Sequence, residues 1–232
     1  MNLPLKRLNY AWLLFDADDT LFDFPRAEAN ALKWTLETSG IPFRAEYFPL
    51  YSRINQQVWK DFEKGQVKVA ELRVQRFRQF LKEAHLTGDL QKISELFLSN
   101  LALGTDLIEH ADEVIHTLKA HYPLALVTNG LHDVQRPRLE ASALKDCFEH
   151  VFISEEIGYA KPAREFFERV FVTLGFPARE DVLIIGDSLS SDMLGGINYG
   201  MDTCWFNPKK EATDLPVTFQ ISDLDELQEI LL

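Results

Sequence analysis

The chain has 232 residues, a formal net charge of −12 and 46% hydrophobic residues. A chain of this size can bury one sizeable core, with or without an inserted second domain. The acidic balance excludes a nucleic-acid polymer as a partner, because phosphate backbones bind to basic protein faces. No apolar run reaches the length of a membrane span, so we expect no membrane association.

The two cysteines, Cys147 and Cys204, lie far apart in the sequence and do not have the spacing of metal ligands. We interpret them as buried thiols in a reducing compartment. No signal peptide is visible before the first apolar run. The expected location is therefore the cytoplasm.

The first predicted element is a short buried strand at residues 9–15, which ends abruptly in the stretch Asp16-Ala17-Asp18-Asp19-Thr20. A helical block follows, because apolar residues recur at spacings of three and four as far as about Leu103. The expected helices cover residues 26–38, 45–63, 69–84 and 89–102. Three arginines of the third helix could face the substrate or solvent, and we expect them to face solvent: Arg73, Arg76 and Arg78.

Short apolar strands alternate with helices in the second half of the chain. The expected strands cover residues 123–128, 151–154, 181–186, 201–206 and 217–221. The expected helices cover residues 111–120, 132–143, 163–174, 191–198 and 223–231. Pro137 falls inside one of these helices, and proline is tolerated in the first helical turn but not in the interior. We therefore expect that helix to begin near Arg136 or to be kinked there.

This alternation predicts an α/β fold, with a doubly wound parallel sheet and helices on both of its faces. The helical block interrupts that pattern directly after the first strand. The predicted organisation is therefore a core domain at residues 1–21 and 105–232 and an inserted all-helical cap domain at residues 22–104.

Polar residues that can do chemistry follow four of the predicted strands. They are Asp16 and Asp18, Thr128 and Asn129, Lys161, and Asp187 and Asp192. Parallel strands deliver such residues to the same edge of the sheet. Each group alone has a structural explanation, because Asp favours turns and helix N-termini and a lysine before a proline can simply be solvated. Three carboxylates at the first strand end repel each other, and Mg²⁺ prefers such hard oxygen ligands.

In combination these motifs resemble the haloacid dehalogenase (HAD) superfamily of phosphohydrolases. The matching residues are Asp16-x-Asp18-x-Thr20, Thr128, Lys161 and Gly186-Asp187-x₄-Asp192. The resemblance implies a Rossmann-like core, and the insert resembles the helical C1-type cap of that superfamily. A narrower resemblance is to the pyrimidine 5′-nucleotidases of the YjjG/YfnB type. It rests on Phe15 to Phe22, Thr128-Asn129-Gly130, Ile153 to Gly158, Ala160-Lys161-Pro162 and Asp192 to Asn198.

The resemblance implies that Asp16 is the nucleophile, which forms an aspartyl-phosphate. Asp18 would protonate the leaving alkoxide and then deprotonate the attacking water. Alternate residues of a strand share a face, so a spacing of two lets both carboxylates reach one substrate. Thr128 and Asn129 would bind the phosphate, and Lys161 would neutralise charge on the phosphoryl group in the transition state.

The implied cofactor is Mg²⁺, which offsets the repulsion between the nucleophile and the phosphate. Its ligands would be the Asp16 carboxylate, the main-chain carbonyl of Asp18 and the Asp187 carboxylate. Asp192 would support the metal directly or through a water molecule.

The expected function is that of a Mg²⁺-dependent phosphomonoesterase, a 5′-nucleotidase for pyrimidine nucleoside monophosphates. The alternative is a phosphatase of a sugar phosphate or another small metabolite. Asp18 disfavours a dehalogenase, whose halide leaving group needs no proton, while a mutase would use the same two aspartates. Two other classes remain: a receiver-like phospho-acceptor module, which the helical insert disfavours, and a catalytically silent interaction protein.

Overall fold

The computed structural model describes residues 9–63 and 65–232, so residues 1–8 of the predicted core and Lys64 of the predicted cap lie outside the described residues. The described chain divides into two compact units. The core unit takes in the residues up to Phe22 together with 107–130 and 142–232, and the helical unit takes in 23–106 and 131–141. Their roles as catalytic core and substrate-selecting cap stay a prediction.

The core unit is built on a six-stranded sheet in which every pair of neighbouring strands is parallel. The strands are β1 (Trp12–Phe15), β2 (Leu124–Thr128), β3 (His150–Ile153), β4 (Val182–Gly186), β5 (Asp202–Phe206) and β6 (Phe219–Ile221). Their order across the sheet is β3-β2-β1-β4-β5-β6. The predicted α/β fold with a doubly wound parallel sheet is thus confirmed.

Strand β1 lies between β2 and β4 and forms the centre of the sheet. Its residues Leu13, Leu14 and Phe15 are completely buried, as expected for a parallel strand that is covered on both faces. The chain extends the sheet from β1 toward β3 and then returns to the other side of β1 with β4. The carboxyl ends of β1 and β4 therefore flank the point where the strand order reverses, which is where open α/β sheets bind ligands.

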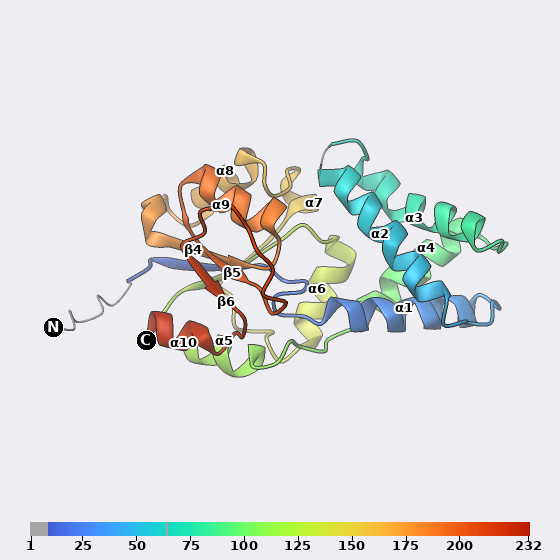
Figure 1. Ribbon diagram of the computed structural model, residues 1–232, viewed down its shortest axis with the longest axis horizontal. Helices are drawn as coiled ribbons and strands as arrows, with labels where there is room; N and C mark the ends of the chain where they lie inside the picture. The colour runs from blue at the N-terminus through green and yellow to red at the C-terminus, as the bar shows by residue number, and fades with distance from the viewer. Residues whose placement is uncertain (1–8, 64) are drawn as a thin grey trace. The chain divides into compact units, whose positions relative to one another are not determined.

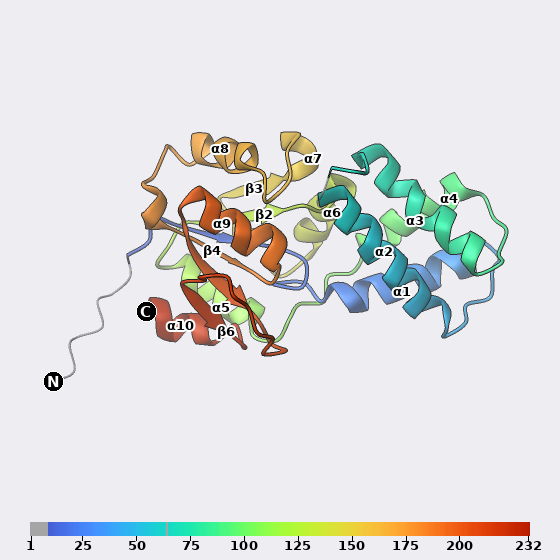
Figure 2. The same cartoon turned by 45° about the horizontal axis from the view of Figure 1, so that its top comes forward.

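The sheet carries helices on both faces, with α8 and α9 on one side and α5 and α10 on the other (Figures 1 and 2). The core-unit helices are α5 (Ala111–Lys119), α7 (Ser154–Ile157), α8 (Arg164–Thr173), α9 (Leu194–Tyr199) and α10 (Glu226–Leu231), with a 3₁₀ turn at Arg179–Asp181 and a π-helical turn at Leu189–Met193. Helix α9 packs very closely on the sheet. A β-carbon on Gly196 would lie 2.6 Å from methyl groups of Ile184 and Thr203.

The helical unit consists of α1 (Phe24–Thr38), α2 (Tyr47–Glu63), α3 (Val69–Glu83), α4 (Leu90–Leu101) and α6 (His132–Ala141). Aromatic rings fill its core: Tyr51 stacks on Phe77 with ring centroids 5.2 Å apart, and Phe97 packs against both. Tyr51, Phe77 and Phe97 belong to the buried faces of α2, α3 and α4, respectively. The apolar residues of these faces recur at spacings of three and four, so the sequence alone predicts amphipathic helices here.

The expectation that Arg76 faces solvent is wrong, because its side chain is buried against the Phe97 ring, with the guanidinium carbon 4.9 Å from the ring centroid. Its Nη1 donates to Asn55 Oδ1 at 3.1 Å, and Asn55 Nδ2 donates to Glu28 Oε1 at 2.6 Å. A buried charge needs such partners. Arg78 is exposed, as expected.

Helix α6 begins at His132 rather than near Arg136. The N–H groups of Val134 and Gln135 both donate to the Leu131 carbonyl, so the first turn is complete before Pro137 is reached. Another difference concerns the segment predicted as a helix at 191–198, which starts as the π-helical turn at Leu189 and continues as α9. Strand β1 is also shorter than predicted.

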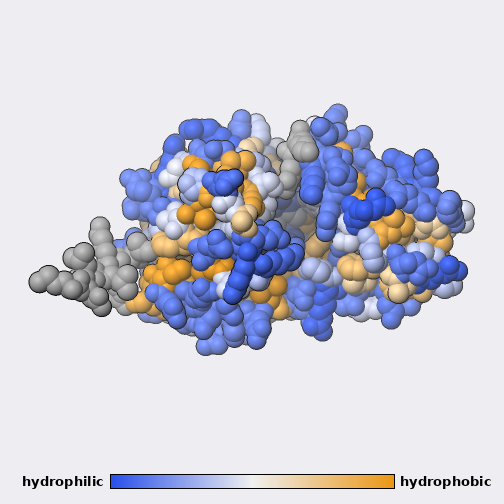
Figure 3. Space-filling model, in the orientation of Figure 1, coloured by the Kyte–Doolittle hydropathy of each residue, from blue (hydrophilic) through white to orange (hydrophobic). Residues whose placement is uncertain are grey.

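Most of the face shown in Figure 3 is hydrophilic, which fits a chain with 26% charged residues. Few large apolar side chains are exposed in the described part of the chain: Trp34, Leu103, Tyr159, Val172, Phe176 and Leu232. Among residues 9–63 and 65–232, no helix combines the length and the apolar character needed to cross a bilayer.

Candidate active site

Asp16 is the first residue after β1, at the point where the strand order reverses. Its main-chain N–H donates to the Ile185 carbonyl of β4 at 2.9 Å, which continues the pairing between the two strands by one residue. The residue is only 8% exposed. The apolar residues of β1 thus form a buried strand that is followed by the buried carboxylate of Asp16.

A tight turn follows Asp16. The N–H groups of Leu21 and Phe22 both donate to the Ala17 carbonyl at 2.9 Å, and Asp19 adopts a left-handed φ of 61°, which Asp tolerates better than most residues. The turn directs the Thr20 hydroxyl back to the strand end, 3.5 Å from both Asp16 Oδ2 and Asp187 Oδ1. Asp18 lies in this turn and is half-buried.

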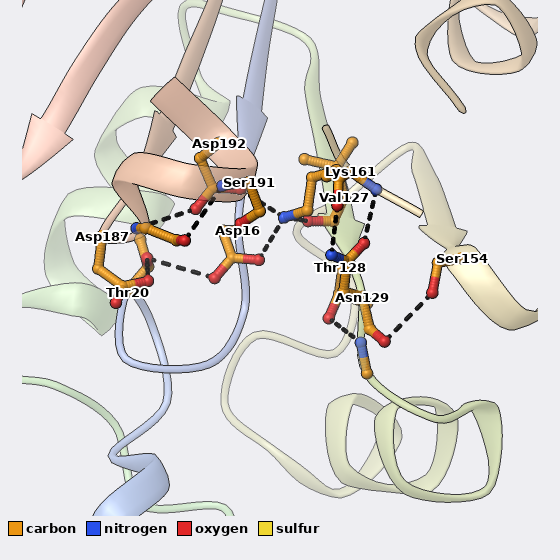
Figure 4. A network of polar contacts seen from close by, with 12 residues as sticks. Asp16, Thr20, Val127, Thr128, Asn129, Ser154, Lys161, Asp187, Ser191 and Asp192 are labelled. Atoms are coloured by element: carbon orange, nitrogen blue, oxygen red, sulfur yellow. Dashed lines mark hydrogen bonds and ion pairs between the residues drawn. The ribbon is translucent and has the colours of Figure 1, made fainter. Parts of the chain in front are cut away.

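Lys161 reaches the same place from the loop after α7 (Figure 4). Its Nζ donates to Asp16 Oδ1 and Asp192 Oδ1, each at 2.6 Å, and to the Val127 carbonyl at 2.7 Å. An ammonium group has three hydrogens to donate, and these three bonds use all of them. Because the side chain is 1% exposed, these partners replace the water that a buried cation loses.

Asp187 and Asp192 come from the segment after β4. Asp192 belongs to the π-helical turn, and its Oδ2 accepts a hydrogen bond from the main-chain N–H of Ser188 at 3.2 Å, which fixes the carboxylate. The indole N–H of Trp205 donates to the Asp187 carbonyl at 2.8 Å. Turns of this kind are often found at functional sites, because they re-aim a side chain that a regular helix would direct elsewhere.

The carboxylates of Asp16, Asp187 and Asp192 form a group that fits a cation. One oxygen from each lies within 4.8 Å of the others, and no other group of three or more His, Cys, Asp or Glu side chains that could hold a metal occurs in the described chain. Lys161 balances only part of their negative charge. A donor set of carboxylate oxygens at one buried point suits a hard divalent cation such as Mg²⁺.

The charges of this cluster are strongly perturbed. Burial raises the pKa of Asp16 to about 8, although the Lys161 ammonium opposes this effect. Burial, followed by the charges of Asp16 and Asp192, also raises the pKa of Asp187 well above its usual range. Burial alone would lower the pKa of Lys161, but the carboxylates of Asp16 and Asp192 outweigh it and the pKa is raised. Lys161 therefore stays charged at neutral pH, while full ionisation of the carboxylates requires more positive charge.

Thr128 and Asn129 stand at the end of β2, beside β1. The Thr128 hydroxyl accepts a hydrogen bond from the Gly130 N–H at 3.0 Å. Asn129 is bonded to the main chain of Lys161, and its own carbonyl accepts a bond from the Ser154 hydroxyl at 3.1 Å. Thr128 and Asn129 thus lie, like Lys161, at the expected edge of the sheet, and the role of all three in phosphate binding stays a prediction.

The amino-acid sequence alone does not reveal every group in this cluster. Direct contacts join Asp16, Lys161 and Asp192, while Thr20 lies beside Asp16 and Asp187. Two further groups had no predicted role: the Ser154 hydroxyl and the Val127 carbonyl. Ser154 could have been found as a hydroxyl that directly follows a strand. The Val127 carbonyl carries no sequence signal, because every residue has one.

The chain is similar in sequence to a known family of hydrolases. Residues 10–200 match the haloacid dehalogenase-like hydrolases. YfnB of Bacillus subtilis (strain 168) is 39% identical over 224 residues, which cover 96% of this chain and 95% of YfnB. The pyrimidine 5′-nucleotidase YjjG of Escherichia coli (strain K12) is 32% identical over 226 residues, which cover 97% of this chain and 99% of YjjG. A crystal structure of the Bacillus subtilis YfnB bound to magnesium superimposes with a TM-score of 0.90 at 38% identity, covering 96% of this chain and 98% of that one.

Proposed function

The chain belongs to the haloacid dehalogenase-like hydrolases, and from this we propose that it is a Mg²⁺-dependent phosphomonoesterase that acts through an aspartyl-phosphate on Asp16. The observation that carries the proposal is the buried Asp16 carboxylate, which is held by Lys161 within a group of three acids. Such a group of buried acids at the carboxyl edge of the sheet is costly unless cations offset its negative charge.

The first step is attack of an Asp16 oxygen on the phosphorus of the substrate, which breaks the bond between phosphorus and the leaving oxygen. Asp16 must be ionised for this step, and its burial opposes ionisation. Mg²⁺ held by the carboxylates of Asp16 and Asp187 and the main-chain carbonyl of Asp18 would supply positive charge that favours the ionised form and offsets the charge of the phosphate. Asp192, which is bonded to Lys161 and to the Ser188 N–H, would support this arrangement.

Asp18 is proposed as the general acid and base. It stands two residues beyond Asp16 and is half-buried, so it can exchange protons with a bound ester. In the first step it protonates the leaving alkoxide. In the second step it takes a proton from water, whose oxygen attacks phosphorus as the bond between phosphorus and Asp16 breaks. The step releases phosphate and restores the Asp16 carboxylate.

Lys161 and Thr128 would handle the transferring phosphoryl group. The ammonium of Lys161 is fixed beside Asp16 Oδ1, so its positive charge is already in place when negative charge gathers on the phosphoryl oxygens. The hydroxyl of Thr128, at the end of the adjacent strand β2, would donate to one of those oxygens. Preorganised groups of this kind need no rearrangement during the reaction, which is why they lower the barrier.

We propose that the substrate is a pyrimidine nucleoside monophosphate. Support comes from YjjG, whose name describes it as a pyrimidine 5′-nucleotidase and which matches nearly the whole chain. The helical unit is proposed to act as the cap that selects the leaving group. Both cysteines are free, which suits the cytoplasmic location proposed for the protein.

The test is phosphate release from a panel of esters, with Mg²⁺ and with EDTA. The panel holds dUMP, UMP, dTMP, AMP, glucose 6-phosphate, phosphoglycolate and p-nitrophenyl phosphate. Asp16→Asn is the inactive control, and Asp214→Asn, at an exposed position, is its charge-matched partner. Mg²⁺-dependent release concentrated on pyrimidine monophosphates supports the proposal. Release only from sugar phosphates or phosphoglycolate overturns the substrate, and release from none overturns the activity.

The role of Asp18 has its own test. Asp18→Asn should slow phosphoryl transfer from an alkyl ester more than from an aryl ester, because an aryl oxide leaves without a proton. Burst measurements with UMP and p-nitrophenyl phosphate separate the two cases. Equal losses on both esters would remove the acid role from Asp18.

A further inference from the structure

The side chain of Asn129 forms a paired hydrogen bond with the main chain of Lys161. Its Nδ2 donates to the Lys161 carbonyl at 2.9 Å, and its Oδ1 accepts from the Lys161 N–H at 2.8 Å. The Asn129 carboxamide therefore bonds Lys161 as a neighbouring β-strand would. Both the N–H and the carbonyl of the Lys161 main chain have a partner. The two residues are 32 positions apart in the chain, so the pair is a tertiary contact.

The same strand end also holds the other end of Lys161. The carbonyl of Val127, two residues before Asn129, accepts a hydrogen bond from Lys161 Nζ at 2.7 Å. The Ser154 hydroxyl, at the start of α7, donates to the Asn129 carbonyl and anchors this residue in turn. Figure 4 shows these bonds, which converge on the residues that end β2.

We infer that Asn129 is a positioning residue, which places the Lys161 ammonium between Asp16 and Asp192 through the Lys161 main chain. The inference rests on the proposed function, because it takes Lys161 as the cation that meets the phosphoryl group. It also departs from the expectation that Asn129 binds the phosphate itself. The Asn129 amide contacts the Lys161 main chain, whereas the bond to the Asp16 carboxylate is made by Lys161 Nζ.

A lysine depends more than most residues on main-chain contacts that hold it in place. Its ammonium sits on a flexible four-carbon stem, so the position of Nζ depends on where the backbone holds the first carbon. The loop that carries Lys161 has no strand partner of its own in the described part of the sheet. The two bonds from Asn129 supply that partner, and displacement of a catalytic group by about 1 Å can lower a rate by about 100-fold.

The core unit contains a matched control for this arrangement. Asn207, in the loop after β5, makes the same pair of bonds to the main chain of Glu211, with Nδ2 donating at 2.9 Å and Oδ1 accepting at 3.0 Å. It is buried like a core residue, and its side chain bonds the main chain of Glu211 rather than that of a lysine. Replacement of Asn207 by alanine therefore removes the same two bonds from the same unit without touching Lys161.

The experiment compares Asn129→Ala and Asn207→Ala in the full-length protein by two measurements. The first is kcat and KM on the best ester of the panel. The second is reductive methylation of Lys161 with formaldehyde, quantified by mass spectrometry, which reports whether Nζ is still buried. We expect Asn129→Ala to lower kcat by about 100-fold with little change in KM, and to increase methylation of Lys161 several-fold. Asn207→Ala should do neither.

Two outcomes of this comparison overturn the inference. A raised KM with unchanged kcat and a protected Lys161 would mean that Asn129 contacts the substrate. Unchanged kinetics and unchanged methylation would mean that the contact has no role in placing Lys161. If Asn129→Ala does not fold, Asn129→Asp provides the same test, because it keeps the acceptor and sets a carboxylate oxygen against the Lys161 carbonyl.

A further variant isolates the route of the effect. In a Lys161→Ala background, Asn129→Ala should cause no additional loss of kcat/KM if Asn129 acts through Lys161, and an independent loss if it acts on the substrate. Failure of the proposed function looks different from failure of the inference. In that case the wild-type protein releases no phosphate from any ester, while the methylation of Lys161 still shows whether Asn129 positions it.

Discussion

The carboxylate of Asp192 occupies the space where Gly186 lacks a side chain. A β-carbon on Gly186 would lie 2.5 Å from Asp192 Cγ and 2.8 Å from Asp192 Cβ, distances that real β-carbons do not adopt. Asp192 Oδ1 accepts a hydrogen bond from Lys161 Nζ, so Gly186 at the end of β4 indirectly determines where the Lys161 ammonium lies.

Gly186→Ala should therefore displace Asp192 and lower kcat by about 100-fold or more. Gly196→Ala is the matched control, because its β-carbon would meet Ile184 and Thr203 at 2.6 Å but would not touch Asp192. Both variants should lose about 1–3 kcal/mol of unfolding free energy through overpacking. Steady-state kinetics well below the melting temperature distinguish them, and equal activity in the two variants would contradict the prediction.

Mg²⁺ should stabilise the folded protein. At 100 times its dissociation constant, a ligand that binds only the native state adds about 2.7 kcal/mol, or an increase in Tm of roughly 5–10 °C for a chain of this size. Asp187→Asn removes one of the three clustered carboxylates and should abolish most of this shift. Thermal unfolding with Mg²⁺ and with EDTA measures it, and Asp214→Asn should keep the full shift. An undiminished shift in Asp187→Asn would place the metal elsewhere.

The buried polar chain in the helical unit should be important for stability. Asn55 joins the carboxylate of Glu28 to the guanidinium of Arg76 and is 1% exposed. Asn55→Ala removes one bond from each buried charged group and should lower the unfolding free energy by about 2–5 kcal/mol. Urea denaturation measures the change. Asn100→Ala, which removes a half-buried bond to Thr35, is the control and should lose about 1 kcal/mol.

The pair His110 and Asp223 should make stability depend on pH. His110 Nδ1 lies 2.7 Å from Asp223 Oδ1, and this hydrogen bond raises the pKa of His110 above its usual 6.5. The pKa of Asp223 is lowered, first by the main-chain N–H of Asp225 and then by His110. The histidine contribution is complete below pH 6.5 and is lost as the pH rises through the raised pKa. The aspartate contribution is complete above pH 3.8 and is lost as the pH falls through the lowered pKa.

The Tm difference between the wild type and Asp223→Asn should accordingly be largest near pH 5 and smaller at pH 9. The effect is small because both side chains are partly exposed to solvent, which screens the interaction. Thermal melts at the two pH values test this sign, with Asp214→Asn as the variant that changes the same charge elsewhere. A difference that grows toward pH 9 would refute the assignment.

Local pattern was sufficient for much of this structure. Three predicted features depend only on residues that are neighbours in sequence: the apolar run before Asp16, the alternation of strands with helices, and the helical block after Thr20. The structure contains all three. The positions of the candidate site residues could be predicted for the same reason. Asp16, Thr128 and Asp187 stand at strand ends, and Lys161 follows β3 after the short helix α7. Parallel strands in one sheet bring their carboxyl ends together.

Other features were not predicted from local pattern. Sequence periodicity places Arg76 on a helix but does not show that Phe97 and Asn55 cover it. It shows that Pro137 disfavours a helix interior but not that α6 would begin at His132 regardless. The burial of Arg76 depends on contacts with other helices, which no local pattern encodes. The start of α6 follows instead from bonds within its first turn, which is complete before Pro137 is reached.

The sequence by itself determined which groups could do chemistry and at which edge of the sheet they would stand. Only the tertiary structure decided how they are joined: Lys161 to a main-chain carbonyl of β2 and to Asp16, 145 residues earlier, and Asn129 to the Lys161 backbone. The physical reason is that side-chain type and periodicity are local properties. The partner of a buried charge, by contrast, is whichever group the completed fold brings within hydrogen-bonding distance.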